Sequence, residues 1–324
     1  MTVPLSRPPS ETYALPFTDA RSLLFQDHLR PWHPVFAKAE KVHQTLHQKN
    51  IHLFAPLYFS NHCVNRCQYC CFKSDNGRVR RYSLSESEFA LEARALWNQG
   101  HRTLLLVAGE HPQFSSLENL ERYLAGLHQD GLNFHLMLEI GSLTRKEYKK
   151  IKSLGIRRVL LYQETYDVTA FGEVHQGRKA QFEARIRSAA EAMDSGLEIG
   201  LGILLGLSEW RNDFLALMEH AQGLHRIFNA WPASVSFPRI RRWPGFSFSP
   251  IEIPDSALLK MIALARLCLP WTGIVLSTRE NAFLRDHLLG LGIGITHLSA
   301  GARTVPGAYA LRAAEEDGQF AVRD

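Results

Sequence analysis

The sequence lacks long hydrophobic runs and a recognisable export signal. Its 324 residues contain no run of about 18 apolar residues, so the sequence predicts no membrane-spanning helix. The N-terminal segment MTVPLSRPPSETYALPF has no short apolar core of the kind that signal peptides carry. We therefore expect a cytoplasmic protein that makes no membrane contact.

Cysteine is also scarce, and its distribution is uneven. The chain has five cysteines, four of which lie in the segment CVNRCQYCC at 63–71. An odd cysteine count without an export signal is not the pattern of a disulfide framework. In a reducing compartment, clustered cysteines are more often metal ligands or catalytic groups than crosslinks.

Charge of one sign is only slightly in excess. The 37 Lys and Arg residues against 32 Asp and Glu residues give a net charge of +5. Such an excess fits an ordinary solvated surface, or a surface that attracts an acidic partner. The dense basic segments RVRRY (78–82) and RIRR (239–242) do not belong to a long basic stripe with interleaved aromatics. The sequence therefore does not predict nucleic-acid binding.

Short apolar segments alternate with amphipathic helical segments along most of the chain. Their composition and spacing predict strands separated by helices. Eight strands over about 250 residues predict the α/β class and a closed (βα)8 barrel of the TIM type, with a doubly wound open sheet as the alternative. The predicted strands are 52–60, 102–110, 133–141, 157–165, 198–206, 233–240, 272–278 and 294–300.

The chain contains no linker rich in Gly, Pro or Ser that would separate two domains. We therefore expect one barrel domain at 51–324, with residues 1–50 forming an N-terminal helical extension. Capping boxes at Ser85 with Glu88 and at Thr144 with Glu147 support helices after the first and third strands.

Polar residues stand at the C-terminal ends of most predicted strands. In a (βα)8 barrel these ends meet at one rim, where active sites are built. Rim residues are often polar simply because loops face water. Here, however, so many of them would face the cysteine loop that we expect a functional site. They are segment 63–70, Glu110, Glu139, Gln163 with Glu164, Arg239 with Arg241, Arg279 with Glu280, and Ser299.

The cysteine loop has the spacing Cys63-x3-Cys67-x2-Cys70, with Cys71 adjacent. Thiolates suit soft metals, and such short intervals let one loop surround a cluster. Three ligands are one short of closing a tetrahedral zinc site or a [4Fe–4S] cube. His62 and Cys71 each adjoin another ligand, where both side chains cannot easily turn inward. The spacing favours a [4Fe–4S] cluster with one open iron, with zinc binding and redox switching as alternatives.

The same segment resembles the signature of the radical S-adenosylmethionine superfamily, which is C-x3-C-x2-C with an aromatic residue, here Tyr69, before the last cysteine. The wider sequence is similar to the aromatic amino-acid lyase branch, which includes 2-iminoacetate synthase and the tyrosine lyase of hydrogenase maturation. The resemblance extends from about Pro56 to Tyr309. It is carried by APLYFSNHCVNRCQYCCF, LLLVAGEHP, LYQETYD, GLGILLGLSEW, SFPRIR, LSTRE and LSAGARTVPGAY.

The resemblance implies two cofactors, a [4Fe–4S] cluster and S-adenosylmethionine. Cys63, Cys67 and Cys70 would hold three irons, and S-adenosylmethionine would chelate the fourth.

Five residues outside the cysteines match positions that contact S-adenosylmethionine or the substrate in the family. Glu110 would accept a hydrogen bond from the methionyl ammonium, and Arg185 would pair with the methionyl carboxylate. Tyr69 would lie near the adenine. Glu164, with Gln163, would touch the ribose or the substrate amine.

The resemblance also implies a clamp for an amino-acid substrate. Arg279 with Ser299 would grip the substrate carboxylate, because an arginine fork suits a carboxylate. Arg239 and Arg241 are rivals for this role, or braces for other rim carboxylates. Tyr58 would point into the barrel beside the substrate, although a core position is the alternative for this aromatic residue.

The implied activity is radical fragmentation of an aromatic amino acid, with tyrosine cleaved at Cα–Cβ to p-cresol and dehydroglycine (2-iminoacetate). We expect Tyr58, Glu164, Arg279 and Ser299 to act in catalysis. The aromatic segment WPGFSFSP after Arg242 leaves a tryptophan lyase, or a related radical enzyme of specialised metabolism, as an alternative. A non-catalytic iron–sulfur electron carrier is a further one. An acidic flavodoxin or ferredoxin is the expected reductant.

Overall fold

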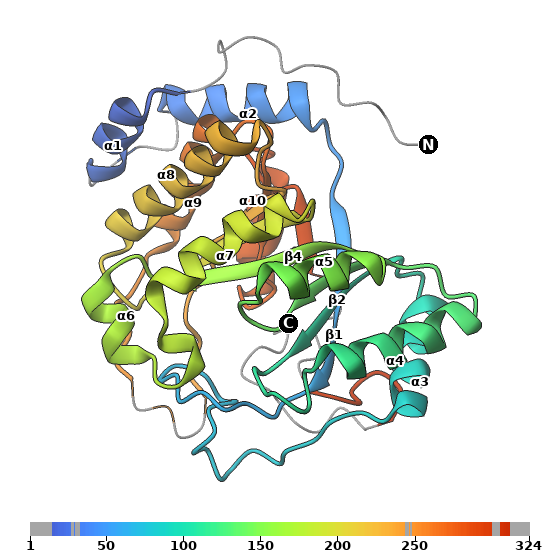
Figure 1. Cartoon of the computed structure of the whole chain (residues 1–324). Helices are drawn as coiled ribbons and strands as arrows, with labels where there is room; N and C mark the ends of the chain where they lie inside the picture. The colour runs from blue at the N-terminus through green and yellow to red at the C-terminus, as the bar shows by residue number, and fades with distance from the viewer. Residues whose placement is uncertain are drawn as a thin grey trace.

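The computed structural model describes residues 15–26, 29, 33–243, 246, 248–299 and 305–311. Within them, eight parallel strands close into one barrel in chain order (Figure 1). The predicted (βα)8 fold is confirmed, and the open-sheet alternative is wrong. The strands are β1 (His52–Ser60), β2 (Thr103–Ala108), β3 (His135–Glu139), β4 (Ile156–Glu164), β5 (Glu198–Ile203), β6 (Ser234–Ser236), β7 (Gly273–Leu276) and β8 (His297–Ser299).

Helices surround the barrel and connect its strands (Figure 1). Both predicted capping boxes are formed, at Ser85 with Glu88 and at Thr144 with Glu147. The described helices after β1 are α3 (Glu86–Asn98), α4 (Leu117–Gln129), α5 (Arg145–Ser153), α6 (Val168–Val174), the 3-10 turn η2 (Arg178–Ala180), α7 (Phe182–Asp194), α8 (Trp210–Phe228), α9 (Asp255–Cys268) and α10 (Ala282–Gly290).

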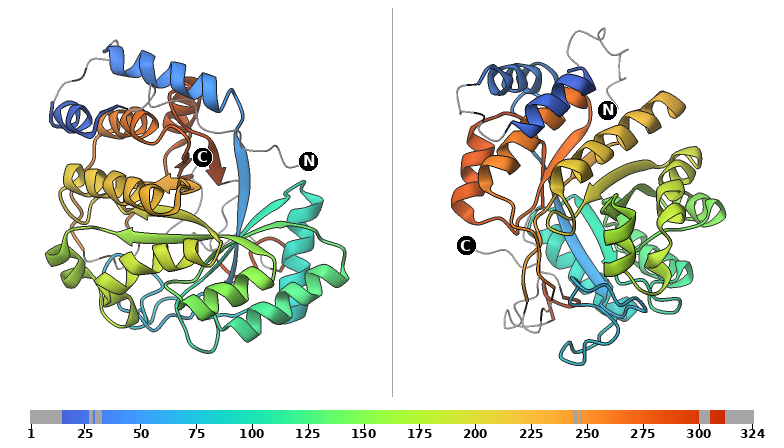
Figure 2. Two further views of the ribbon diagram at one scale, coloured as in Figure 1. Left: turned by 45° about the horizontal axis from the view of Figure 1, so that its top comes forward. Right: turned by 90° about the vertical axis from the view of Figure 1, so that its left-hand side faces the viewer.

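Two helices precede the barrel. Helices α1 (Phe17–Phe25) and α2 (Pro34–Leu46) lie together against α9, outside the barrel (Figure 2). The apolar side chains of Leu24 and Val42 are buried in the same core as those of the barrel helices. Among the described residues, no helix is long and apolar enough to cross a membrane.

The interior of the barrel is filled with apolar side chains below its C-terminal rim. Phe54, Leu105, Met137 and Leu160 are buried there and pack together. A larger apolar core lies between the strands and the surrounding helices. The barrel is thus solid over its lower part, and space for a ligand remains only toward the rim.

Candidate active site

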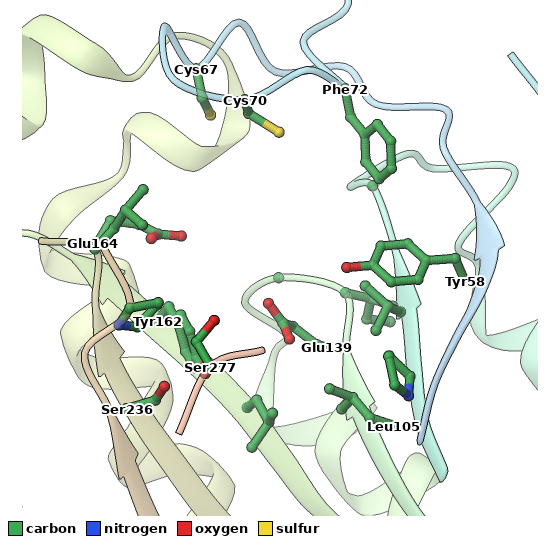
Figure 3. Close-up of a pocket in the computed structure, with 18 of the residues that line it drawn as sticks. Tyr58, Cys67, Cys70, Phe72, Leu105, Glu139, Tyr162, Glu164, Ser236 and Ser277 are labelled. Carbon is green, nitrogen blue, oxygen red and sulfur yellow. The ribbon is translucent and has the colours of Figure 1, made fainter. Parts of the chain in front are cut away.

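A cavity of about 230 Å³ opens at the C-terminal ends of the strands (Figure 3). Of the individual residues expected from the sequence to form the site, all but Gln163, Arg239 and Glu280 line it. The expected residues that line it are Tyr58, Cys63, Cys67, Tyr69, Cys70, Glu110, Glu139, Glu164, Arg185, Arg241, Arg279 and Ser299. The barrel topology therefore gathers side chains that lie far apart in sequence.

The cysteine loop follows β1 and lies tightly against the end of β2. The amide of Val64 donates to the carbonyl oxygen of Glu110, at 2.9 Å. A Cβ atom on Gly109 would stand 2.4 Å from the carbonyl oxygen of His62 and 2.8 Å from Cβ of Cys63. Gly109 is therefore required by the close approach of two backbones.

Three of the cysteines face the cavity. Cys67 is buried, Cys63 and Cys70 are half-buried, and all three are free thiols; Figure 3 shows Cys67 and Cys70 above the cavity. Burial raises the pKa of Cys67 to about 12, and Lys179 opposes this rise. Cys71 is not among the lining residues. In the described part of the chain, no three His, Cys, Asp or Glu side chains are placed to share one metal ion. The three thiols thus line one shared cavity.

Glu110 and Arg185 form an ion pair at one side of the cavity. Nη1 of Arg185 lies 3.4 Å from Oε1 of Glu110, and its Nη2 donates to the carbonyl oxygen of Tyr162 at 2.5 Å. The side-chain amide of Asn65 donates from Nδ2 to Oε2 of Glu110 at 2.9 Å. A Cβ atom on Gly141 would lie 2.4 Å from Oε1 of Glu110. The carboxylate is therefore fixed between the cysteine loop, α7 and a glycine of the β3–α5 loop.

Glu164 pairs with a lysine that sequence analysis missed. The register of β4 shifts between Tyr162 and Glu164, and Glu164 has a φ of 73°, in the left-handed region. Oε1 of Glu164 lies 2.5 Å from Nζ of Lys179, which also stands 5.7 Å from the ring centre of Tyr69. Desolvation lowers the pKa of Lys179, but Glu164, Cys67 and Glu110 together raise it by more, so the net shift is upward.

Tyr69 is anchored by a hydrogen bond to His175. Nδ1 of His175 lies 2.9 Å from the carbonyl oxygen of Phe171, which can only accept, so Nδ1 carries the proton. Nε2 of His175 then accepts from the Tyr69 hydroxyl at 2.8 Å. Burial, followed by Lys179, lowers the pKa of His175 to about 2, so the ring stays neutral. The hydroxyl of Tyr69 is thereby engaged away from the cavity that its ring lines.

The expected substrate residues lie on one wall of the cavity. Tyr58 belongs to β1, Arg279 follows β7 and Ser299 ends β8, and these strands are neighbours in the barrel. Figure 3 shows the Tyr58 hydroxyl directed into the cavity. This placement favours the site position of Tyr58 over the alternative of an ordinary core position.

Glu139 lies in the same cavity as these residues, although its position in the sequence predicted only that it ends a strand. It ends β3 and lines the cavity, where its carboxyl group faces inward (Figure 3). Desolvation, and then repulsion from Glu164, raises the pKa of Glu139 to about 7. The pKa of Tyr58 is also raised, first by desolvation and then by the charge of Glu139.

Arg239 and Gln163 lie outside the cavity. The guanidinium group of Arg239 donates from Nε to Glu280 at 3.1 Å and from Nη1 to Asp255 at 2.7 Å. Of the two roles suggested by the sequence, this geometry favours a brace. Gln163 is buried, but strand alternation directs its neighbours in β4 toward the cavity and Gln163 away from it.

Arg241 keeps both roles that the sequence suggested. It lines the cavity, and its Nη2 lies 3.4 Å from Oε2 of Glu280.

The aromatic segment at 243–250 is only partly within the described residues. Phe246 and Phe248 pack against the apolar cluster of Cys67 and Tyr69. No described residue of this segment lines the cavity. The described part of the segment therefore gives no reason to prefer an indole ring in the pocket.

Comparisons with known proteins agree with this geometry. Residues 57–221 match the family model of the Radical SAM superfamily, and 236–322 match the Biotin and Thiamin Synthesis associated domain. The chain is similar to 2-iminoacetate synthase of Escherichia coli (strain K12), with 35% identity over 277 residues, 84% of this chain and 72% of the relative.

Two solved structures extend the comparison. The chain is similar to the FeFe-hydrogenase maturase HydG from Carboxydothermus hydrogenoformans, with a TM-score of 0.88 and 35% identity, covering 95% of this chain and 71% of that one. Methylornithine synthase (PylB) has a TM-score of 0.76 at 22% identity, covering 95% and 90% of the two chains, and shares the fold.

Proposed function

Because the chain belongs to the radical S-adenosylmethionine superfamily, we propose that it is a carbon–carbon lyase that cleaves tyrosine at Cα–Cβ to p-cresol and dehydroglycine (2-iminoacetate). The 35% identity to 2-iminoacetate synthase and to HydG, over most of each chain, supports this assignment. The observation that carries it is one cavity that joins three cysteine thiols to an inward-facing tyrosine, carboxylates and an arginine. A simple electron carrier has no need of such a cavity.

The residues at the top of the cavity fit the two cofactors of the family. Cys63, Cys67 and Cys70 supply soft donors on one short loop and would hold the [4Fe–4S] cluster. Glu110 and Arg185 present an anion and a cation side by side, which suits the ammonium and carboxylate of a methionyl group. When bound, the cluster and S-adenosylmethionine together supply the reductive cleavage that yields methionine and a 5′-deoxyadenosyl radical.

The remaining residues at this level position the adenosyl part and exclude water. The ring of Tyr69 lines the cavity and is held by His175, so it offers a rigid apolar surface for the adenine. Glu164, held by Lys179, offers an acceptor for ribose hydroxyls. Phe72 covers the cavity beside Tyr58 and limits solvent entry (Figure 3).

The substrate would lie deeper, with its polar end at the rim and its ring in the barrel. Arg279 and Ser299 would bind the carboxylate, with Arg241 as a second cation nearby. The apolar side chains of Leu105, Leu160 and Val275 line the lower part of the cavity and suit an aromatic ring.

Anaerobic reconstitution with iron and sulfide, followed by product analysis with tyrosine and with tryptophan, tests the proposal. We expect p-cresol from tyrosine, and a Cys67→Ala variant should bind less iron and form no product. A Cys71→Ala variant is the matched control and should keep its cluster. An indole product would identify a tryptophan lyase instead. A brown protein that never cleaves S-adenosylmethionine would be an electron carrier.

We also propose that an acidic flavodoxin or ferredoxin supplies the electron, which the net charge of +5 supports. A reduction rate that falls as ionic strength rises would agree, because salt screens such attraction. A rate independent of salt would contradict it.

A cytoplasmic location is part of the same proposal. The five free cysteines support it, since an oxygen-sensitive cluster needs thiols that stay reduced. Fractionation of cells that express the full chain would test it.

A further inference from the structure

Three carboxylates line the cavity, and one of them differs from the other two. Glu110 is bonded to Arg185 and Asn65, and Glu164 to Lys179. The side-chain carboxylate of Glu139 makes no hydrogen bond or ion pair with any residue that the structure describes. A carboxylate in a desolvated site without a donor is unfavourable unless a ligand supplies one. Glu139 is therefore the carboxylate that is available to a bound molecule.

Glu139 shares its surroundings with a positive charge. Glu139, Arg279, Tyr58 and Tyr162 all line the same cavity. The charge of Glu139 raises the pKa of both tyrosine hydroxyls, and the charge of Arg279 lowers it. An α-amino acid carries an ammonium and a carboxylate on the same carbon atom. Such a zwitterion needs an anion and a cation in one site, and Glu139 and Arg279 provide these two charges in the same cavity.

We propose that Glu139 receives the α-ammonium group of the amino-acid substrate and removes one of its protons, while Arg279 holds the α-carboxylate; this inference presupposes the amino-acid substrate proposed above. One N–H bond of the ammonium breaks heterolytically, and the proton moves to a carboxylate oxygen of Glu139. The electron pair stays on nitrogen, so the step involves no oxidation or reduction. The product is a neutral amine, which is the form required for hydrogen-atom abstraction from nitrogen.

The electrostatics of the site suit a group that takes up a proton near neutral pH. Desolvation and the charge of Glu164 raise the pKa of Glu139 to about 7, and Lys179, Arg279 and Arg185 oppose the rise. An ammonium and a carboxylate that meet in a desolvated site are both destabilised as ions, which favours proton transfer between them. Below about pH 7 a protonated Glu139 could not act as the acceptor.

Binding to the unreduced holoenzyme, with S-adenosylmethionine present and oxygen excluded, tests this role without turnover. Calorimetric titrations would compare tyrosine, tyramine, which lacks the carboxylate, and 3-(4-hydroxyphenyl)propanoate, which lacks the ammonium. In Glu139→Gln, the affinities for tyrosine and tyramine should fall by about tenfold to a hundredfold, as expected for loss of a charge-assisted hydrogen bond. The affinity for the propanoate should not fall.

The pH dependence and a matched variant separate this role from a structural one. Tyrosine affinity of the wild type should rise between pH 6 and 8 as Glu139 ionises, and Glu139→Gln should lose this rise. Glu198→Gln, at the start of β5 and far from the rim, should leave all three affinities unchanged. If Glu139→Gln weakened tyrosine and the propanoate equally, Glu139 would be structural and the proposal wrong.

The outcome also separates this inference from the proposed substrate. If the wild type bound tryptophan and not tyrosine, the substrate assignment would fail. Tryptamine and indole-3-propanoate would then decide the role of Glu139 by the same comparison. Binding of neither amino acid would overturn both.

Discussion

The two ends of the barrel each bury a guanidinium group, but its hydrogen-bond partners differ between them. At the C-terminal rim, Arg185 faces the carboxylate of Glu110. At the N-terminal end, Arg266 is fully buried and donates to the carbonyl oxygens of Pro270, Thr272 and Gly294, at 2.8 to 2.9 Å. The carboxylate at the rim belongs to a side chain, so it can move and bind a ligand in place of Arg185. The carbonyl oxygens before β7 and β8 belong to the backbone, so the fold fixes their positions.

Histidines extend this contrast at the N-terminal end. Nε2 of His47 lies 2.7 Å from Nη1 of Arg266 and 2.8 Å from the carbonyl oxygen of Pro270, and His43 stacks on His47. Burial, and then Arg266, lowers the pKa of both histidines to about 4. Neutral rings and carbonyls thus surround the cation, so this end has the composition expected of a structural element, in agreement with the usual division of roles in such barrels.

Removal of Arg266 should have the largest effect on stability. An Arg266→Met variant leaves several buried carbonyl oxygens without their guanidinium donor, each costing about 1–3 kcal/mol. We expect a loss of about 3 kcal/mol or more in the free energy of unfolding, measured by urea titration. If the variant folds at all, its affinity for S-adenosylmethionine should match that of the wild type. A variant that keeps its stability but binds S-adenosylmethionine more weakly would contradict a structural role for the N-terminal end.

The matching change at the rim should affect binding more than stability. Arg185→Met removes one partner of Glu110, so we expect affinity for S-adenosylmethionine to fall by about tenfold to a hundredfold. The midpoint of thermal unfolding should change much less than in Arg266→Met. Equilibrium binding to the reconstituted, unreduced protein measures the first quantity, and calorimetry the second. Destabilisation as large as that of Arg266→Met would show that the rim pair is structural too.

The two ends also differ in how far the sequence alone could predict them. Strand periodicity and the C-x3-C-x2-C spacing were enough to place Glu110 and Glu164 on a common rim, because strand ends of a barrel converge. Lys179 was missed because its position depends on a 3-10 turn in the loop before α7, which no strand periodicity describes. Glu139 was recognised as a strand end, but the absence of a partner for its carboxylate among the described residues is a property of packing.

The sequence placed arginines near the rim but could not distinguish their roles. The pattern SFPRIR predicted that Arg239 and Arg241 reach the rim, but it did not show which of them faces the cavity. Arg239 instead contacts Asp255 at the start of α9, a residue that is close only in the folded chain. Arg266 drew no attention in the sequence, because a single arginine in an apolar helix is not a motif.

Acidification should destabilise the N-terminal end before it affects the apolar core. His43 and His47 have folded-state pKa values of about 4 against 6.5 when unfolded, and the value for His297 is about 3. A depressed histidine pKa means that the neutral form is favoured by folding, so this stability is complete above pH 6.5 and is lost as the pH falls toward 4. For His43 alone, we expect about 2 kcal/mol of loss at pH 5.

Urea midpoints at pH 7.5, 6 and 5 measure this loss, and a His43→Gln variant should show a shallower dependence. Glu139 acts in the opposite sense, because its raised pKa favours the folded state as the pH falls below 7. A Glu139→Gln variant should therefore show a steeper loss of stability on acidification than the wild type. Identical pH profiles for all three proteins would contradict the assignment.

The smallest effect is expected for an exposed charge pair at the N-terminal end. Nη2 of Arg158 lies 2.8 Å from Oε2 of Glu198, whose side chain is 55% exposed. Solvent screens such a pair, so Glu198→Ala should change the free energy of unfolding by less than about 1 kcal/mol, and the difference should shrink further in high salt. A change comparable to that of Arg266→Met would mean that charge at this end of the barrel stabilises the fold whether or not it is buried. A small one would show that burial, together with backbone acceptors, gives Arg266 its effect.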